Sequence, residues 1–249
     1  MSTSPRILIL GATSAIAQAY ARRRAAEGAT FVLAGRHAER LAGVAADLVA
    51  RGAQSAEPFL IDLADIAGIE SAAQRLNERF ANPDEVIVAY GAFGQQAEME
   101  RNLVTARMAI DSNFTSAALW ILALLKDRPA AAPLTVVGIG SVAGDRGRAT
   151  NFIYGAAKSG LDRFLEGLAQ KYDGSPVRIV RVKPGFVDTP MTADFDKGGP
   201  LWATPERVAA DIHRAVMKGR RVVYTPWFWW PIMMVIRHLP WFIFKRLKV

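Results

Sequence analysis

The sequence predicts an α/β fold in which a doubly wound parallel sheet of about seven strands carries helices on both faces. Along most of the 249 residues, short apolar runs alternate with longer stretches of helical periodicity. The runs are continuously apolar, as strands covered on both faces must be. A chain of this length can bury a substantial core in one large domain. No repeat or low-complexity linker divides the chain before about residue 220.

Each expected element is a run of the matching period. The strands are expected at 6–10, 30–34, 57–61, 85–89, 134–139, 177–182 and 222–224. The helices are expected at roughly 15–27, 39–51, 65–80, 101–126, 152–172 and 205–218. In a doubly wound sheet, ligands bind at the carboxyl ends of the strands, around the point where the strand order reverses. We expect residues 1–225 to form this domain and residues 226–249 to form a helical extension.

Composition excludes several kinds of site. The chain has no cysteine, which excludes disulfides and thiolate metal centres. Its three histidines, His37, His213 and His238, are scattered, so no metal site is expected. Residues 1–5 lack the basic start and apolar stretch of a secretory signal, so we expect a cytoplasmic protein.

The positive charge lies in the C-terminal region. All 23 acidic residues fall within residues 1–211, where 23 Lys and Arg residues balance them. Residues 212–249 hold eight basic residues and no acid, so the net charge of +8 belongs to this region. Nucleic-acid binding by the domain as a whole is therefore not indicated.

The extension combines apolar, aromatic and basic residues. Three prolines interrupt it, so it lacks the stretch of about 20 apolar residues that a membrane-spanning helix needs. The pattern favours two short helices at the inner face of a membrane, with basic residues facing anionic lipid. It also fits a helical pair packed over a substrate pocket or against a second copy, and both arrangements can hold together. Four of the six tryptophans fall here, namely Trp227, Trp229, Trp230 and Trp241.

The first strand passes through a turn of small residues directly into a helix. Such a turn lets backbone N–H groups and the helix N-terminus approach a pyrophosphate. Only the first of the three glycines expected in a dinucleotide-binding turn is present, since Ala15 and Ala17 replace the others. Taken alone, the turn fits an ordinary strand-to-helix connection as well. The residues expected at the phosphates are Gly11, Thr13, Ser14, Ala15 and Ile16.

The end of the second strand predicts which dinucleotide binds. NAD sites place an acid there for the ribose 2′-hydroxyl, whereas NADP sites use a basic residue for the 2′-phosphate. Here the strand ends in Ala34-Gly35-Arg36, and the first carboxylate is Glu39. A guanidinium can hold a phosphate through a bidentate, charge-assisted pair. We expect NADP(H); the alternative is that Arg36 is a solvated loop residue.

Ser141, Tyr154 and Lys158 form a candidate catalytic group. Ser141 follows a strand, and a four-residue step on a helix places Tyr154 and Lys158 on one face. A free tyrosine titrates near ~10, and a neighbouring ammonium is expected to lower that pKa toward neutrality. Ser141 would then hydrogen-bond a substrate oxygen while a hydride reaches the adjacent carbon.

This pattern resembles the active site of the short-chain dehydrogenase/reductase family, and the resemblance covers roughly residues 6–225. It rests on Ser141, on Tyr154-Gly-Ala-Ala-Lys158 and on Asn113 within Asp-Ser-Asn-Phe. It implies a Rossmann-type domain that transfers a hydride between a nicotinamide cofactor and a carbonyl or alcohol. By the same match, Asn113 would hold a water of a proton relay behind Lys158, and Lys158 would contact the nicotinamide ribose.

The resemblance implies further cofactor contacts. In the Pro-Gly segment after the sixth strand, the Val187 backbone and the Thr189 side chain would fix the carboxamide. The family's Asn-Asn-Ala-Gly segment appears here as Ala89-Tyr90-Gly91-Ala92, so backbone contacts can remain while the asparagine side-chain contacts are lost. Beyond the first turn, the cofactor residues so expected are Arg36, Asp62, Leu63, Ala89, Tyr90, Gly91, Tyr154, Lys158, Pro184, Gly185, Val187 and Thr189.

The substrate pocket is expected under residues 190–203, where Gly198-Gly199-Pro200 predicts a mobile loop. Arg146 and Arg148 lie between Ser141 and Tyr154 and are candidates for holding a phosphate near the reacting carbon. Ordinary surface solvation explains these two arginines as well. Phe186 is a further candidate for contact with the substrate.

A narrower resemblance, over most of the chain, is to the actinobacterial decaprenylphosphoryl keto-pentose (2-keto-ribose) reductases. It rests on residues 145–155, on Lys183-Pro-Gly185 and on the extension at 233–240 and 243–247. It implies reduction of the 2-keto-pentose of a polyprenyl phosphate, a step in cell-envelope precursor synthesis, with an oxidase partner supplying the ketone. The alternatives are a reductase of another lipid carbonyl (3-oxoacyl, sterol or retinoid) and a non-catalytic NADP-binding regulator. The family precedent also implies a dimer or tetramer packed through residues 101–126 and 152–172.

Overall fold

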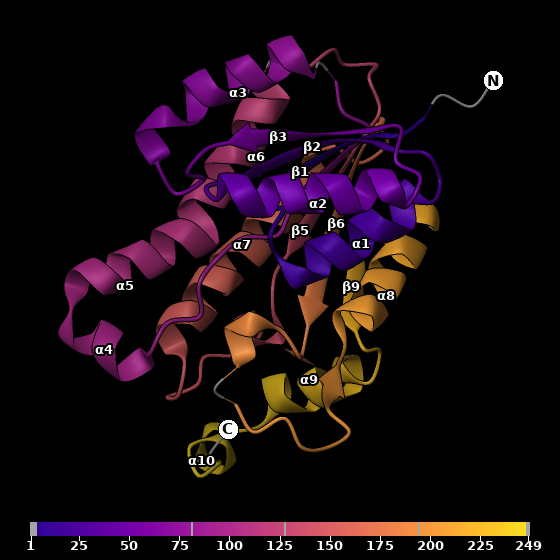
Figure 1. Ribbon diagram of the computed structural model, residues 1–249. Coiled ribbons are helices and arrows are strands. Elements are labelled where there is room, and N and C mark those ends of the chain that lie inside the picture. The colour runs from indigo at the N-terminus through magenta and orange to yellow at the C-terminus, as the bar shows by residue number, and fades with distance from the viewer. Residues whose placement is uncertain (1–3, 81, 127, 194, 248–249) are drawn as a thin grey trace.

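A seven-stranded parallel sheet forms the centre of the computed structural model, which describes residues 4–80, 82–126, 128–193 and 195–247. The strand order is β3-β2-β1-β4-β5-β6-β9, so the chain moves outward in both directions from β1 and β4 (Figure 1). This is the doubly wound order that the sequence predicts. The strands are β1 Arg6–Leu10, β2 Thr30–Gly35, β3 Ser55–Leu60, β4 Glu85–Val88, β5 Leu134–Ile139, β6 Val177–Pro184 and β9 Val222–Thr225.

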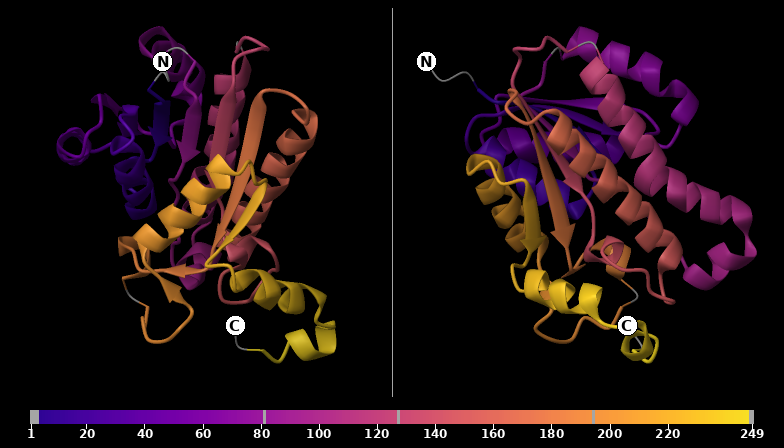
Figure 2. Two further views of the ribbon diagram at one scale, coloured as in Figure 1. Left: turned by 90° about the vertical axis from the view of Figure 1, so that its right-hand side faces the viewer. Right: turned by 180° about the vertical axis from the view of Figure 1, so that it is seen from behind.

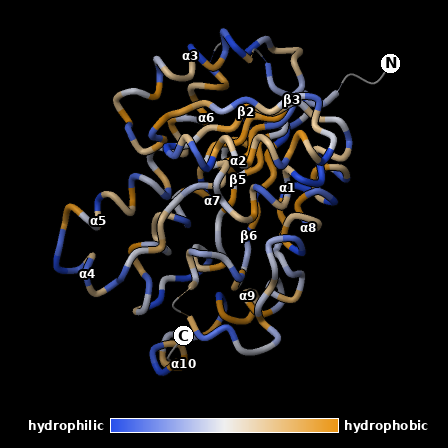
Figure 3. Tube along the Cα trace, in the orientation of Figure 1, coloured by the Kyte–Doolittle hydropathy of each residue, from blue (hydrophilic) through white to orange (hydrophobic). Residues whose placement is uncertain are grey.

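Helices cover both faces of the sheet and enclose two separate apolar cores. Ile7 and Ile9 of β1 point into one core, and Leu8 and Leu10 point into the other, because successive strand side chains face opposite sides. Figure 3 shows the strands as the most continuously hydrophobic part of the trace. One face is covered by α1 Ala15–Ala25, α2 Ala38–Ala50 and α8 Pro205–Met217, and the other by α3 Ile69–Arg79, α6 Ser116–Lys126 and α7 Phe152–Lys171.

The helix expected over residues 101–126 is divided. A short helix, α4 (Gln96–Arg101), ends at Asn102, whose side chain accepts hydrogen bonds from the N–H groups of Val104 and Thr105. This cap starts α5 (Leu103–Ile110), and a π-helical turn at Asp111–Thr115 then leads into α6. The helical run therefore extends from Leu103 to Lys126, close to the predicted 101–126, and only the π-helical turn within it was not indicated by the sequence.

Residues 103–126 are long and apolar enough, by length and composition alone, to cross a membrane. Trp120 and Ile121 are buried in the core beside α3, and Asn113 is fully buried near the carboxyl edge of the sheet. These contacts identify the segment as a core helix of the domain.

The extension forms two short helices, as predicted: α9 (Trp229–His238) and α10 (Trp241–Phe244). Both lie beyond the carboxyl end of β6, as the yellow segment in Figure 2 shows. Trp229 and Met233 of α9 are buried in a small third cluster with Val142. Lys248 and Val249 of the predicted extension, and Asp194 of the predicted pocket cover, lie outside the described residues.

Buried charges connect the strands at this end of the sheet. Lys183 of β6 donates hydrogen bonds to Asp145 at 2.6 Å and to Asp162 of α7 at 2.9 Å. Tyr224 of β9 donates to the second oxygen of Asp145 at 2.7 Å. Because all three groups are nearly inaccessible to solvent, loss of Lys183 removes the ammonium that the two buried carboxylates share.

Candidate active site

The predicted functional residues gather along one edge of the sheet. Six of them come one or two residues after the carboxyl ends of six strands, which run parallel, so these ends meet at the same edge. In chain order from β1 to β6, these residues are Gly11, Arg36, Asp62, Tyr90, Ser141 and Gly185, whereas Asn113, Tyr154 and Lys158 come from helical segments.

Ser141 is held against helix α7 by direct backbone packing. It precedes a short 3-10 helix at Val142–Gly144, and its hydroxyl oxygen accepts a hydrogen bond from the Ala143 N–H at 3.1 Å. A methyl group on Gly144 would lie 2.8 Å from the Ser159 nitrogen, and one on Gly155 would lie 2.9 Å from the Ala143 oxygen. Only glycine permits so close an approach, which fixes Ser141 relative to the first turns of α7.

Tyr154 and Lys158 lie one turn apart on α7, as the spacing predicts. Both are buried, with exposed fractions of 7% and 5%. The Lys158 ammonium donates a hydrogen bond to the Ile139 carbonyl at 3.1 Å, and its nitrogen lies 5.8 Å from the centre of the Tyr154 ring. Ser141 hydrogen-bonds the Tyr154 hydroxyl. The three residues therefore form one contiguous group.

The expectation that Lys158 lowers the pKa of Tyr154 is corrected by this geometry. Burial raises the pKa of Tyr154 to about 12, although the hydrogen bond with Ser141 acts in the opposite direction. Burial also lowers the pKa of Lys158 to about 8. Removing a phenolate or an ammonium from water disfavours its charged form, and here that effect exceeds the attraction between the two groups. Tyr154 is therefore a neutral phenol at neutral pH, the form that can donate a proton.

Asn113 lies in the π-helical turn and completes the buried group. Its amide nitrogen donates to the carbonyls of Ala92 at 2.7 Å and Ala109 at 2.8 Å. Its amide oxygen is buried and has no hydrogen-bond partner among the described residues. That oxygen faces Gly91, where a methyl group would lie 2.3 Å from it and 3.5 Å from the Lys158 nitrogen. Asn113 thus presents an acceptor beside Lys158, which fits the relay position implied by the family resemblance.

The turn after β1 has the geometry of a dinucleotide cradle. Gly11 has a φ of +91°, and a methyl group there would lie 2.8 Å from the Tyr90 Cβ. Both facts require glycine. Helix α1 begins at Ala15, and the Ser14 side chain does not cap it, so the first N–H groups of the helix remain available to a phosphate. Thr13, Ala15 and Ile16 belong to the same turn.

Tyr90 uses its side chain inside the domain. Its hydroxyl lies 3.0 Å from the Ser116 hydroxyl, and its ring packs against the core under α6. Only the backbone of Ala89–Gly91 is then directed to the carboxyl edge, in keeping with the predicted loss of side-chain contacts there. At the adenine end of the cradle, Asp62 and Arg36 are exposed, whereas Leu63 is buried and its carbonyl accepts a hydrogen bond from Trp120 at 3.2 Å.

The Pro184–Gly185 segment is covered by the extension. The Gly185 N–H donates to the Thr225 carbonyl at 3.1 Å. A methyl group on Gly185 would lie 1.8 Å from the Trp229 indole nitrogen, which is buried without a hydrogen-bond partner among the described residues. Val187, buried in strand β7 (Phe186–Val187), pairs with β8 (Trp202–Ala203), and Thr189 follows it. Sequence reasoning missed the role of Trp229, since no local pattern connects it to Gly185.

Aromatic side chains form the wall around Tyr154. The ring of Phe93 lies 4.9 Å from that of Tyr154, and Phe195 lies 5.4 Å from Phe93. Phe186, a predicted substrate contact, is stacked on Trp202 at 5.3 Å and meets Trp229 edge-on at 5.4 Å. Phe195 belongs to the predicted pocket cover at 190–203, although it was not singled out there, and Phe93 was not predicted because it lies in an irregular loop without periodicity.

The two predicted phosphate-binding arginines have different surroundings. Arg146 donates to the carbonyls of Ile236, Arg237 and Leu239, and its guanidinium lies 3.7 Å from the centre of the Phe244 ring. It therefore fastens the extension to the domain, and its assignment to a substrate phosphate is revised. Arg148 keeps a buried Nε without a partner among the described residues, and burial lowers its pKa.

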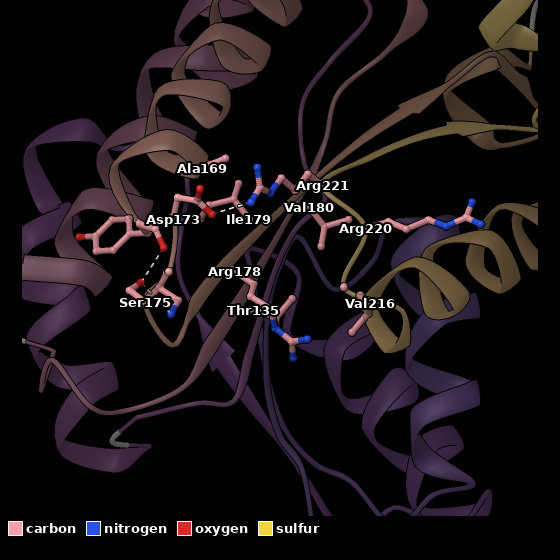
Figure 4. A pocket seen from close by; sticks show the side chains of 14 residues that line it. Thr135, Ala169, Asp173, Ser175, Arg178, Ile179, Val180, Val216, Arg220 and Arg221 are labelled. Carbon is pink, nitrogen blue, oxygen red and sulfur yellow. Dashed lines mark hydrogen bonds and ion pairs between the residues drawn. The ribbon is translucent and has the colours of Figure 1, made fainter.

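A second hollow lies at the opposite edge of the sheet (Figure 4). It is formed where β5 and β6 begin and α8 ends, and its lining includes Arg178, Arg220, and Arg221 paired with Asp173. None of the predicted site residues lines it. The candidate catalytic group lies instead in the aromatic-walled cluster at the carboxyl edge.

Comparison with known proteins identifies the family. The family model described as short chain dehydrogenase matches residues 5–199. The chain belongs to the short-chain dehydrogenase family. It is therefore an oxidoreductase, and Asn113, Ser141, Tyr154 and Lys158 lie within the matched residues.

Relatives of this short-chain dehydrogenase span its whole length. It is 37% identical over 241 residues to an "uncharacterized oxidoreductase" of Mycobacterium tuberculosis, covering 97% of this chain and 96% of that protein. It is 37% identical over 256 residues to an "uncharacterized oxidoreductase" of Streptomyces coelicolor, covering 100% of this chain and 98% of that one. A short-chain dehydrogenase from Sphingobium yanoikuyae in complex with NADPH has the same fold, with a TM-score of 0.80, 23% identity and coverage of 98% and 96%.

Proposed function

We propose that this short-chain dehydrogenase reduces a ketone with NADPH and that Tyr154 donates the proton. The observation that carries the proposal is a neutral, buried Tyr154 hydroxyl in contact with Ser141 and one helical turn from Lys158. These residues share the carboxyl edge of the sheet with the Gly11 turn. A proton donor and a dinucleotide cradle thus lie on the same side of the domain.

Three features support a dinucleotide as the cofactor. The Gly11 turn allows close backbone approach, the N-terminus of α1 has uncapped N–H groups, and Gly91 leaves space beside Asn113 and Lys158. The exposed Arg36 at the end of β2 supports a 2′-phosphate, and hence NADP(H). The structural relative from Sphingobium yanoikuyae binds NADPH.

The cofactor assignment is tested by the Michaelis constants for NADPH and NADH. Replacement of Arg36 by alanine removes the guanidinium, so the Michaelis constant for NADPH should rise about tenfold or more while that for NADH changes little. Arg23→Ala is the matched control, since Arg23 is an exposed arginine on α1 away from the carboxyl edge. A wild-type preference for NADH would contradict the assignment.

Each residue of the catalytic group has a distinct part in the reaction. When bound, the cofactor supplies the hydride. The Ser141 hydroxyl hydrogen-bonds the substrate oxygen and holds it beside the phenol. Tyr154 transfers its proton to that oxygen as negative charge develops there. Lys158 stabilises the phenolate that remains, and Asn113 accepts a hydrogen bond in the relay that returns a proton.

We propose the 2-keto-pentose of a polyprenyl phosphate as the substrate. The narrower resemblance over residues 145–155 and in the extension supports this class. Arg148, seven residues after Ser141 in the chain, supplies a buried guanidinium nitrogen for the phosphate, and the aromatic wall with the extension supplies apolar surface for the lipid. An oxidase that acts on the same lipid-linked pentose would supply the ketone.

The substrate class is tested by NADPH oxidation with a polyprenyl-phosphate keto-pentose and with lipid ketones that lack phosphate. The phosphate-bearing substrate should be preferred. Arg148→Ala should raise the Michaelis constant for this substrate by about tenfold to a hundredfold and leave that for the lipid ketones unchanged. Arg163→Ala is the control, because Arg163 is a surface residue of α7 paired with Asp162. Equal rates with both substrate types would favour the second candidate, a reductase of another lipid carbonyl, which the apolar Phe93–Phe195 wall also suits.

We also propose that two or more copies associate through α5, α6 and α7. Leu103, Val104 and Met108 of α5 are large apolar side chains that are mostly exposed in one chain. A face of this kind is typical of an interface. Light scattering after size exclusion should give a dimer or tetramer, and a monomer at micromolar concentration would contradict the proposal.

A further inference from the structure

The two helices of the extension have opposite sides of different character. Trp229, Met233 and Phe244 are buried against the domain. On the other sides of the same helices, Trp230 is 56% exposed, Val235 63% and Trp241 69%. We call the exposed apolar set the outer face; it consists of Trp227, Trp230, Val235, Trp241 and Phe242.

The outer face is held in place and is not a loose tail. Arg146 binds three carbonyl groups at the C-terminal end of α9 and stacks on Phe244 of α10. Trp229 is seated on Gly185, and Met233 packs with Val142, the residue after Ser141. Inner contacts to the catalytic edge therefore orient the exposed aromatic residues.

The charges that the extension itself carries are all of one sign, although Glu166 of α7 lines a hollow together with Trp230 and Arg237. The described part of the two helices and the residues after them carries Arg237, Lys245 and Arg246, and residues 212–249 contain no acid. Tryptophan rings favour the depth of lipid headgroups, and Lys and Arg favour anionic headgroups. A protein partner would need an acidic and apolar surface at the same place. An anionic bilayer provides both, with negative headgroups outside and apolar chains beneath them.

The exposed apolar side chains of α5 provide an internal contrast. Leu103, Val104 and Met108 are as exposed as those of the outer face. Their neighbours on α4 and α5 include Glu98 and Glu100 together with Arg101 and Arg107, so both signs of charge are present. Apolar exposure is common to the two surfaces, whereas only the outer face belongs to a segment, residues 212–249, that carries basic residues and no acid.

We propose that the outer face docks on an anionic phospholipid bilayer, which brings the catalytic edge of the domain against the membrane surface. The aromatic side chains insert at headgroup depth, and Lys245 and Arg246 contact lipid phosphates. Because the inner side of α9 touches both Gly185 and the residue after Ser141, these residues of the catalytic edge lie next to the docked surface. The proposal does not depend on which ketone the enzyme reduces.

Vesicle co-sedimentation tests the proposal with the full-length protein. Wild type should bind vesicles of phosphatidylcholine with phosphatidylglycerol, bind phosphatidylcholine vesicles weakly, and shift its tryptophan emission to shorter wavelength on binding. The variant Trp241→Ser with Phe242→Ser should lose at least tenfold in binding. The variant Lys245→Glu with Arg246→Glu should lose roughly 30-fold or more for anionic vesicles.

The matched control carries Val49→Ser and Met217→Ser, which remove exposed apolar side chains on α2 and α8 without touching the extension or the proposed interface. It should bind anionic vesicles like wild type. All the changed side chains are exposed, so each variant should keep its fold. Thermal unfolding and NADPH binding of each variant check this. Failure of wild type to bind anionic vesicles would overturn the proposal, as would equal binding by the Trp241–Phe242 variant. A Trp241–Phe242 variant that only lowers the mass of an oligomer would assign the outer face to a second copy and would also overturn it.

Discussion

Helices α7 and α9 both contact the turn that carries Ser141, but they do so in different ways. Helix α7 approaches it through backbone, with Gly144 and Gly155 leaving no room for a side chain. Helix α9 approaches it through large side chains, with Met233 and Trp229 packed around Val142 and Arg146 holding the helix end. Backbone contact fixes the position of Ser141 relative to Tyr154 closely. Side-chain contact allows the position of the extension relative to the domain to vary. The catalytic geometry therefore belongs to the α7 contact, and the extension adds a cover that can be altered by degrees.

The largest expected effect is at the buried charges through which Lys183 of β6 joins α7 to the turn after Ser141. Lys183→Met leaves Asp145 and Asp162 without their shared ammonium, so the free energy of unfolding should fall by about 3–5 kcal/mol. Arg51→Ala is the control, because it breaks an exposed pair with Asp47 and should cost under ~1 kcal/mol. Urea unfolding of both variants measures the difference. Similar midpoints for the two would contradict the structural importance of the network.

The backbone contact of α7 is tested by two glycines of one helix. Gly155→Ala places a methyl group 2.9 Å from the Ala143 oxygen, so stability should fall by about 1–3 kcal/mol and kcat should fall with it. At Gly167, nothing lies within 4 Å of the added methyl group, so Gly167→Ala should stabilise α7 by about 0.5–1 kcal/mol. Thermal unfolding and kcat of both variants are to be compared. Two changes of the same sign would refute the backbone-contact explanation.

The pH dependence of reduction tests Lys158. Its pKa is lowered by burial to about 8, and the ammonium is the form that stabilises the Tyr154 phenolate. The charged form persists below this pKa and is lost above it. The rate of ketone reduction should therefore be level below about pH 8 and fall about tenfold per pH unit above it. Lys158→Arg cannot lose its proton in this range, so its profile should stay flat there; an unchanged descending limb in that variant would assign the titration to another group.

The side-chain contact of α9 should give the smallest effect. Gly185→Ala alone pushes a methyl group into Trp229 and should raise the Michaelis constant for NADPH severalfold, because the Pro-Gly segment shifts. In combination with Trp229→Ala, the clash is absent. The effects of the two substitutions on the free energy of NADPH binding should therefore be coupled by about 0.5–3 kcal/mol. Cofactor titration of the four proteins of this cycle measures the coupling. Strictly additive effects would show that α9 does not support the segment.

Local geometry made the catalytic group predictable from sequence. A four-residue step on a helix places Tyr154 and Lys158 together in almost any context, and parallel strands bring their carboxyl ends to one edge. The strands at 6–10 and 134–139 match their predicted bounds for the same reason, since buried apolar runs end where turn residues begin. The two short helices of the extension followed from its proline-interrupted apolar pattern.

Properties that depend on tertiary contacts were not predictable. An arginine such as Arg146 reads alike in sequence whether it binds a phosphate, water or, as here, carbonyl groups some ninety residues further along the chain. The raised pKa of Tyr154 depends on burial, which its neighbours in sequence do not determine. Phe93 and Phe195 come from loops whose meeting leaves no periodic signal.

The most direct test of the account is the rate of NADPH oxidation by a ketone substrate in wild type and in Tyr154→Phe. The substitution removes one oxygen from a buried ring and leaves the cradle at Gly11 unchanged. The account predicts that kcat falls by about 10²–10⁴, while the dissociation constant for NADPH stays near that of wild type. Retention of most of the wild-type rate would contradict the assignment of Tyr154 as proton donor.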